Sequence, residues 1–132
     1  PMVDIGHCDD AEVIVIAFGT AGKYIRYTVQ QMRAAGMPVG YIRPITLFPF
    51  PTEAVRAAVS GARLVAVYEN NQGQMVDDVR LAIEGRVPVR FIGGLSLDTS
   101  GFGIAPDYDV GVLQARIEPL LRSATSGDGG VR

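Results

Sequence analysis

The fold of this chain is decided by one stretch, Arg63-Leu64-Val65-Ala66-Val67-Tyr68-Glu69-Asn70-Asn71-Gln72-Gly73-Gln74-Met75. The apolar run at residues 64–67 is typical of a strand buried on both faces of a parallel sheet. The run breaks into polar residues at 69–74, and from Met75 onward apolar residues recur with helical spacing. Strand, polar loop and helix form half of a βαβ unit, and in open α/β sheets ligands and partners gather at that loop edge. The stretch therefore predicts where the working surface lies.

Length and composition bound the class of protein. At 132 residues, the chain is predicted to form one domain over residues 1–122, followed by a flexible tail over 123–132. A hydrophobic content of 48% and a charged content of 20% are typical of a globular protein. The net charge of -2 argues against nucleic acid as a partner, because nucleic acid normally requires a basic patch.

The compartment is predicted from what the sequence lacks. No apolar stretch approaches the roughly 20 residues that a transmembrane helix needs, and the N-terminus has no signal-peptide pattern. Cys8 is the only cysteine, which excludes an internal disulfide and a four-thiolate iron–sulfur site. We therefore expect a cytoplasmic protein without a membrane partner.

Apolar runs and helical stripes alternate along the rest of the chain. Further strands are predicted at residues 12–18, 39–42 and 87–92, with a short edge strand at 3–8. Helices are predicted to begin at Thr20 and Thr52, to end at Gly36 and Gly61, and to cover 74–84 and the C-terminal region, where Pro119 should kink or split the helix. Residues 93–109 are predicted to be a long loop. This alternation predicts an α/β fold, a three-layer α/β/α sandwich around a mainly parallel sheet.

The segment at residues 44–51 contains Pro44, Pro49 and Pro51. Each proline lacks an N–H group and disfavours the helical conformation before it, so neither a regular helix nor a central strand can form there. The segment is strongly apolar, and we expect a fixed, packed loop.

Two features next to strand ends could bind a charged group. Residues 19–22, Gly-Thr-Ala-Gly, join a strand to a helix N-terminus. They lack the glycine spacing of a dinucleotide fold and the Gly-Lys-Ser/Thr ending of a P-loop. The favoured interpretation is a turn with a cap from the Thr20 hydroxyl, and the alternative is a bound anion or partner carboxylate. Arg43 is either a surface charge or the partner of an acidic group, for which Glu69 is a candidate in a structural ion pair.

Amide side chains are dense at Asn70, Asn71, Gln72 and Gln74. Amides cannot act as general acids or bases, but they bind backbone and carboxylate groups well. The favoured interpretation is loop shaping and contact with another subunit, with ligand contact and plain solvation as alternatives.

No complete active site follows from the sequence. His7, Cys8, Asp9 and Asp10 are adjacent in an extended segment and would point to opposite sides, and no second cluster of metal ligands follows. With His7 as the only histidine and no Gly-x-Ser-x-Gly motif, a serine triad has little support. We assign no catalytic, cofactor-binding or metal-binding residue.

Three blocks of sequence carry a resemblance. They are Ile-Val-Ile-Ala-Phe-Gly-Thr-Ala at 14–21, Val-Gly-Tyr-Ile-Arg-Pro-Ile-Thr-Leu-Phe-Pro-Phe-Pro at 39–51, and Glu-Asn-Asn-Gln-Gly-Gln-Met-Val-Asp-Asp-Val-Arg at 69–80. Together they resemble the alpha subunit of 2-oxoacid:ferredoxin oxidoreductases, in its transketolase C-terminal-like domain, over roughly residues 10–121. The 2-oxoglutarate and branched-chain types are more similar than the pyruvate type. The chain departs from the pattern at residues 95–107, where relatives tend to be shorter.

The resemblance implies a role in a larger enzyme. The family decarboxylates a 2-oxoacid on thiamine diphosphate, passes electrons through iron–sulfur clusters to ferredoxin, and forms an acyl-CoA. It implies that thiamine diphosphate, Mg²⁺ and the clusters lie outside this domain, which packs against other domains of the alpha subunit and against the beta subunit. It also implies a mixed sheet of about five strands, for which residues 3–8 are the candidate antiparallel edge.

Two other hypotheses stand beside this assembly domain of an oxidoreductase. One is a free-standing module that binds a small anion, and the other is an independent enzyme. The chain could also form a homodimer. The residues expected at an interface or cleft edge are Thr20, Arg43, Thr46, Glu69, Asn70, Gln72, Gly73 and Gln74.

Overall fold

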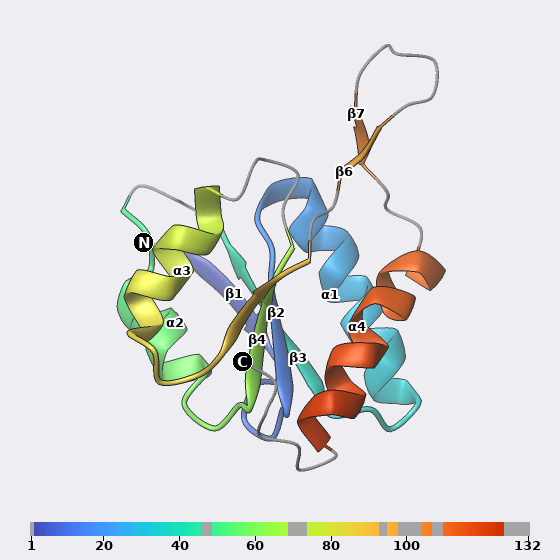
Figure 1. Cartoon of the computed structure of the whole chain (residues 1–132), viewed down its shortest axis with the longest axis horizontal. Coiled ribbons are helices and arrows are strands. Elements are labelled where there is room, and N and C mark those ends of the chain that lie inside the picture. The colour runs from blue at the N-terminus through green and yellow to red at the C-terminus, as the bar shows by residue number, and fades with distance from the viewer. Residues whose placement is uncertain are drawn as a thin grey trace.

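A five-stranded sheet lies between two pairs of helices (Figure 1). The structure, a computed structural model, describes residues 2–45, 49–68, 74–92, 95–97, 104–106 and 110–125. In chain order the elements are β1 (Val3–Gly6), β2 (Val13–Ile16), α1 (Gly19–Ala34), β3 (Val39–Pro44), α2 (Thr52–Ala58), β4 (Leu64–Val67), α3 (Gln74–Ile83), β5 (Val89–Phe91), β6 (Leu95–Leu97), β7 (Ile104–Pro106) and α4 (Val110–Thr125). The predicted three-layer α/β/α architecture is confirmed.

The sheet has the strand order β1-β3-β2-β4-β5. The pairs β3–β2, β2–β4 and β4–β5 are parallel, and β1 pairs with β3 in the antiparallel direction. This confirms the mixed sheet and its antiparallel edge strand, although that strand ends at Gly6 and not at Cys8. The central position of β2 and β4 explains their continuous apolar sequences, because both faces of each strand are covered.

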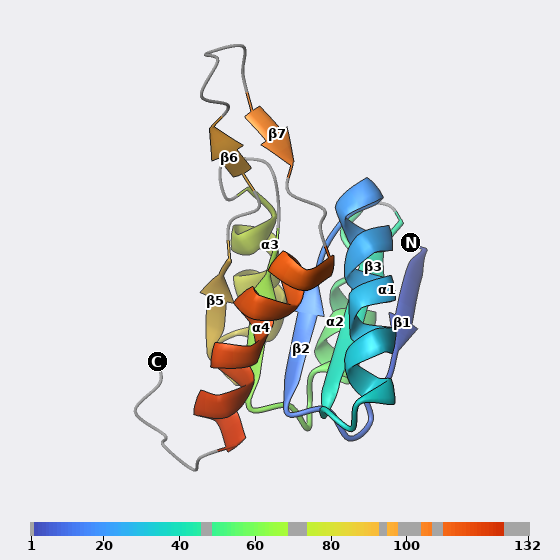
Figure 2. The same ribbon diagram turned by 90° about the vertical axis from the view of Figure 1, so that its right-hand side faces the viewer.

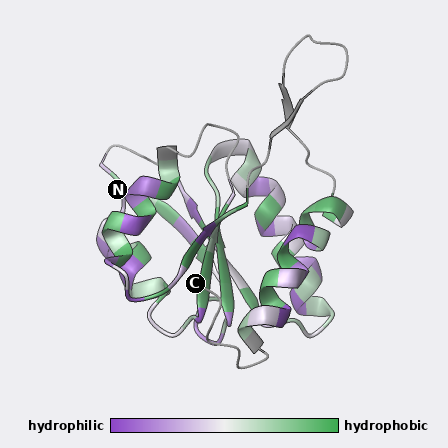
Figure 3. Ribbon diagram, in the orientation of Figure 1, coloured by the Kyte–Doolittle hydropathy of each residue, from purple (hydrophilic) through white to green (hydrophobic). Residues whose placement is uncertain are grey.

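The sheet separates two apolar clusters. On β2, Val13 and Val15 face the cluster formed with α1 and α4, whereas Ile14 and Ile16 face the cluster formed with α2 and α3. All four side chains are fully buried, and the strands appear as a hydrophobic band in Figure 3. A β-strand alternates its side chains between faces, so one short run of sequence supplies both clusters.

Helices α1 and α4 lie together on one face of the sheet (Figure 2). Their buried stripes are the predicted ones, Ile25, Val29 and Met32 on α1 and Leu113, Ile117 and Leu121 on α4. Helices α2 and α3 pack on the other face, through Val55 and through Val79 with its neighbours. Each helix therefore presents an apolar stripe to the sheet.

Several predicted helix boundaries need correction. Gly36, with φ at +85°, follows the end of α1 as predicted, since glycine adopts this conformation without strain. Helix α2 ends at Ala58, before Gly61. Pro119 does not split the last helix, which runs without interruption to Thr125 and so extends into the predicted tail. Pro119 is exposed to solvent.

The predicted loop at residues 93–109 contains regular structure. Strands β6 and β7 pair in the antiparallel direction, with Ser96 opposite Ala105. They form a separate two-stranded sheet beyond the main sheet (Figure 1). The loop prediction was wrong for these two segments, because short three-residue strands leave too weak a pattern to detect.

Candidate functional site

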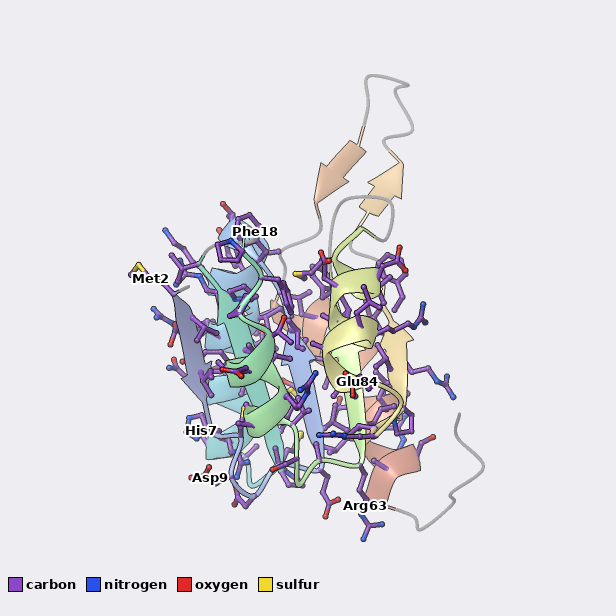
Figure 4. The ribbon with its side chains drawn as sticks, turned by 90° about the vertical axis from the view of Figure 1, so that its left-hand side faces the viewer. Met2, His7, Asp9, Phe18, Arg63 and Glu84 are labelled. Atoms are coloured by element: carbon purple, nitrogen blue, oxygen red, sulfur yellow. The ribbon has the colours of Figure 1, made fainter. Side chains whose placement is uncertain are left out.

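The strands β2, β3 and β4 end at one edge of the sheet, here called the carboxyl edge. Backbone bonds fix this alignment: the Ala17 N–H donates to the Ile42 carbonyl at 3.0 Å, and the Tyr68 N–H donates to the Ile16 carbonyl at 2.9 Å. Figure 4 shows Phe18 and Met2 at this end of the molecule and His7, Asp9 and Arg63 at the opposite end. Segments that follow these strands therefore begin at a common edge, as predicted.

The structure describes only part of the predicted interface set. Thr20 is exposed in the first turn of α1, and Arg43 lies near the end of β3, so both lie at the carboxyl edge. Gln74 is the first residue of α3, of which only the backbone is described. The remaining predicted residues, Thr46, Glu69, Asn70, Gln72 and Gly73, lie outside the described residues. The role of the whole set stays a prediction.

Thr20 does not cap α1. The N-cap residue is Phe18, in an extended conformation, and no side chain there bonds to the helix N-terminus. The chain enters the helix through Gly19, with φ at +67°, which moves the helix start ahead of Thr20. The capping prediction was wrong because threonine can cap only from the position immediately before the first helical residue.

Arg43 is held from two sides. Its Nη1 lies 3.6 Å from an Asp4 carboxylate oxygen, and 18% of its side chain is exposed. Its aliphatic stem crosses Gly22 of α1, where an added Cβ would lie 2.6 Å from Arg43 Cγ and 2.7 Å from the Ala17 carbonyl oxygen. A glycine in the helix therefore makes room for the arginine, and the described acidic partner of Arg43 is Asp4. The predicted pairing with Glu69 lies outside the described residues.

Asp4 is the centre of a polar cluster on the α1 side of the sheet. Arg26 Nη1 donates to one carboxylate oxygen at 3.0 Å, and the Tyr41 hydroxyl donates to the other at 3.2 Å. Burial, and then the nearby Asp4 charge, raise the pKa of Tyr41 above its ordinary value. The cluster fixes the edge strand β1 to β3 and α1, and thereby holds Arg43 at the carboxyl edge.

Sequence reasoning missed this cluster. Asp4 lies directly opposite Arg43 in the antiparallel register, but that register is fixed only when β1 folds back on β3. One sequence feature could have indicated the cluster, namely an aspartate within the predicted edge strand at residues 3–8. An inward-pointing charge on an edge strand needs a partner.

The opposite edge of the sheet holds the segment from His7 to Asp10. Arg33 of α1 fixes it by donating to the His7 carbonyl at 2.8 Å and to both Asp10 carboxylate oxygens at 2.7 and 3.1 Å. The hydrogen bond from Arg33 lowers the pKa of Asp10 below its ordinary value. The pair is structural, because it joins the β1–β2 connection to the end of α1.

The Cys8 side chain is buried beside this segment. Its thiol donates to the Tyr41 carbonyl at 3.3 Å and to the Gly6 carbonyl at 3.5 Å. Burial, and then the Asp9 charge, raise the pKa of the thiol to about 11. A thiol that keeps its proton at neutral pH is a poor nucleophile, so Cys8 acts as a core residue.

Neither a metal centre nor a membrane span is found in the described part of the chain. Within the ranges given above, no three His, Cys, Asp or Glu side chains lie together so as to bind a metal ion. No described helix has the length and apolar character needed to cross a bilayer. A shallow groove of about 560 Å³ does occur, but it lies at the end of α3 and is lined by Arg80, Gly85, Arg86, Val87, Pro88 and Val89. It is therefore remote from the predicted edge.

The mixed five-stranded sheet with helices on both faces is an α/β domain that also occurs in two enzymes of known structure. The chain matches a structure titled 2-oxoglutarate:ferredoxin oxidoreductase from Magnetococcus marinus with 2-oxoglutarate, coenzyme A and succinyl-CoA bound. The TM-score is 0.73 at 22% identity, over 92% of this chain and 20% of that one. It also matches a split-gene transketolase, an inactive beta4 tetramer, with a TM-score of 0.59 at 14% identity, over 86% of this chain and 39% of that one. At these identities the likeness shows the fold.

The family is shown by sequence. Residues 11–100 match the model of pyruvate:ferredoxin oxidoreductase core domain II. The chain belongs to the 2-oxoacid:ferredoxin oxidoreductase family, as a core domain of the kind found in its alpha subunits.

Curated relatives agree with this family. The ketoisovalerate oxidoreductase subunit VorB of Methanothermobacter thermautotrophicus is 45% identical over 75 residues, which is 56% of this chain and 21% of that subunit. The pyruvate synthase subunit PorA of the same organism is 30% identical over 126 residues, which is 92% of this chain and 30% of that subunit. The chain thus spans less than a third of the length of these relatives.

Proposed function

We propose that this chain is a non-catalytic assembly domain of an alpha subunit in a thiamine-diphosphate-dependent 2-oxoacid:ferredoxin oxidoreductase. In the complete cytoplasmic enzyme, thiamine diphosphate, Mg²⁺ and iron–sulfur clusters would be bound by other domains and by the beta subunit. That enzyme would convert a 2-oxoacid to an acyl-CoA and reduce ferredoxin. The observation that carries the proposal is the family match, which covers most of the chain but a minor part of each relative.

The pKa shifts and ion pairs of the ionisable groups support a structural role for the domain. The pKa shifts of Cys8, Asp10 and Tyr41 each follow from burial or from a neighbouring charge inside the domain. Arg43, the charged residue described at the carboxyl edge, is paired with Asp4 of β1. These groups stabilise the fold, and the carboxyl edge then contributes shape to the wall of a neighbouring cofactor cleft.

The test compares the isolated chain with the complete enzyme. We expect the isolated chain to give no turnover with 2-oxoacid, CoA, thiamine diphosphate, Mg²⁺ and an electron acceptor. In the complete enzyme, Arg43→Gln should lower the yield of assembled complex or its activity. Arg63→Gln, at the opposite edge and exposed beside Glu12, is the control and should change neither. Turnover by the isolated chain would refute the assembly role.

The competing hypothesis is a free-standing module for a small anion. One observation favours it: Arg43 Nε is buried without a hydrogen-bond partner among the described residues. Thermal-shift measurements of the isolated chain with phosphate, nucleotides and 2-oxoacids distinguish the two functions. A saturable rise in melting temperature that Arg43→Gln abolishes would favour the module, and no shift is expected from an assembly domain.

A further inference from the structure

The outer surface of α1 and α4 differs from the outer surface of the other helical layer. We infer that this surface, called here the α1/α4 face, docks onto a partner subunit of the oxidoreductase, through a protein surface that carries carboxylates around an apolar patch. The inference rests on the proposed function and adds to it the face and the chemistry of the partner. The face turns toward the viewer in Figure 2.

Large apolar and aromatic side chains are exposed on this face. The exposed fraction is 52% for Tyr27 and 40% for Tyr24 on α1, and 36% for Val112 on α4. Phe18, directly before α1, is 39% exposed. Tyrosine buries a large rigid area at low entropic cost, and aromatic residues are enriched in protein interfaces.

The α1/α4 face also exposes polar and small residues. The exposed residues of α1 include Lys23, Gln30 and Gln31, and those of α4 include Ala115 and Pro119. Between these residues lie basic side chains, including the exposed Arg26 and Arg122, and no fully exposed carboxylate of either helix would have to be desolvated on docking. Arginine is enriched and aspartate and glutamate are depleted in protein interfaces.

The charges of the α1/α4 face are mostly positive. Helix α1 has Lys23, Arg26 and Arg33 and no acidic residue, and α4 has Arg116 and Arg122 and a single, partly exposed acid, Glu118. Arg26 and Arg33 already pair with carboxylates of this chain, whereas Lys23 has no ion-pair partner among the described residues. Lys23 lies one helical turn from Tyr27, so a partner that covers the tyrosine can offer a carboxylate to the lysine.

The opposite layer provides the internal comparison. The exposed residues of α2 and α3 include Glu53, Asp77 and Arg80, with both signs of charge mixed. Leu81 is 74% exposed there, but it is the only large apolar side chain that α2 and α3 expose. A single apolar residue on a charged helix is ordinary solvent-facing surface.

The charge of the α1/α4 face also helps to decide which kind of molecule binds there. Symmetric pairing of two copies through this face would oppose two mostly basic surfaces, which like-charge repulsion disfavours. The net charge of -2 of the chain disfavours nucleic acid as the occupant. The relatives are named as subunits and are more than three times longer than their matched regions, so a partner subunit is the occupant that the face fits.

The test is hydroxyl-radical footprinting of two exposed side chains. Tyr27 reports on the α1/α4 face, and Leu81 is the control on the opposite layer. Modification rates are measured in the isolated chain, in the complete alpha subunit alone, and in the assembled enzyme. We expect Tyr27 to react in the first two and to be protected at least about tenfold on assembly, because an interface core excludes water. The rate for Leu81 should change by less than about twofold, since single exposed residues lie on free surface.

A matched pair of double variants tests the same face by affinity. Lys23→Glu with Tyr27→Ala, made in the complete subunit, should raise the dissociation constant of the complex at least about tenfold, the effect of losing an interface anchor. Arg80→Glu with Leu81→Ala also reverses one positive charge and truncates one large side chain, here on α3, and should leave the dissociation constant within about twofold. Melting temperatures of the isolated variants verify that both remain folded.

Four outcomes would overturn the inference. They are protection of Leu81 in place of Tyr27, a Tyr27 that stays reactive in an assembled complex, protection already present in the complete subunit alone, and self-association of the isolated chain that buries Tyr27. In each of these cases the assembly role can still hold. Turnover by the isolated chain, in contrast, would refute the proposed function itself.

Discussion

Helices α1 and α4 cover one face of the sheet, and α2 and α3 cover the other. Beneath both layers the core is mainly apolar, and the side chains of β2 are shared evenly between its two clusters. Outside, the α1/α4 face exposes tyrosines and carries no exposed acid on its helices, whereas α2 and α3 expose charges of both signs. Folding requires apolar residues on the inner surface of both layers. The outer surfaces differ in composition because they are suited to different environments, a partner protein on one side and solvent on the other.

The largest expected effect tests whether the two interiors are equivalent. Ile25 of α1 and Ile83 of α3 are each 1% exposed in opposite clusters. We expect Ile25→Ala and Ile83→Ala each to lower the free energy of unfolding by about 2–5 kcal/mol, from lost burial plus the cavity left behind. Urea denaturation measures both. A cost below about 1 kcal/mol at one site only would show that the layers differ inside as well as outside.

The next prediction concerns the close approach of α1 to β3. Gly22→Ala should destabilise the domain by about 1–3 kcal/mol, because the new methyl group meets the Ala17 carbonyl and the Arg43 stem. Gly61→Ala is the control on the other layer, where the nearest atom lies 4.0 Å away, and it should be neutral or stabilising by up to about 1 kcal/mol. A neutral Gly22→Ala in the same urea titration would mean that Arg43 is not held as described.

A smaller effect is expected from the polar cluster on the α1 side. Asp4→Ala leaves Tyr41 and Arg43 without their shared acceptor and should cost about 1–2 kcal/mol, since part of the carboxylate is exposed to solvent. Asp10→Ala removes a carboxylate whose side chain is 75% exposed and should lower the melting temperature less than Asp4→Ala does. If the two variants had equal melting temperatures, the Asp4 cluster would contribute no more to stability than the surface ion pair between Asp10 and Arg33 does.

The smallest effect is a pH dependence from the α2/α3 side of the core. The pKa of Cys8 is raised from 9.0 to about 11 in the folded state. Between these values the unfolded chain loses the proton and the folded chain keeps it, so stability is complete below pH 9 and falls as the pH rises toward 11. Thermal melts from pH 8 to pH 11 should show a shallower decline for Cys8→Ala.

Tyr41 is the control for this titration, because its pKa is also raised and its loss of a proton destabilises in the same direction. The double variant Cys8→Ala with Tyr41→Phe should therefore be less pH-dependent than either single variant. A wild-type melting temperature that stays constant up to pH 11 would contradict both shifts.

Much of the fold could be predicted because its strands are buried on both faces. Continuous apolar runs identified β2 and β4, and stripes such as Ile25, Val29 and Met32 identified the helices. The location of the carboxyl edge followed from the alternation of strand and helix. Thr20 was misassigned as a cap because the start of a helix depends on the backbone of Phe18 and Gly19, which composition does not reveal. Strands β6 and β7 were missed because three residues give no usable period.

By itself, the sequence determined the layers, the parallel core of the sheet and the family, since each of these depends on local patterns repeated along the chain. Only the tertiary structure decided that Asp4 meets Arg43, that Gly22 makes room for it, and that the exposed tyrosines share a face without exposed acids. These are contacts between segments distant in sequence. Their physical reason is register and packing, which exist only after the edge strand and the helices have closed on the sheet.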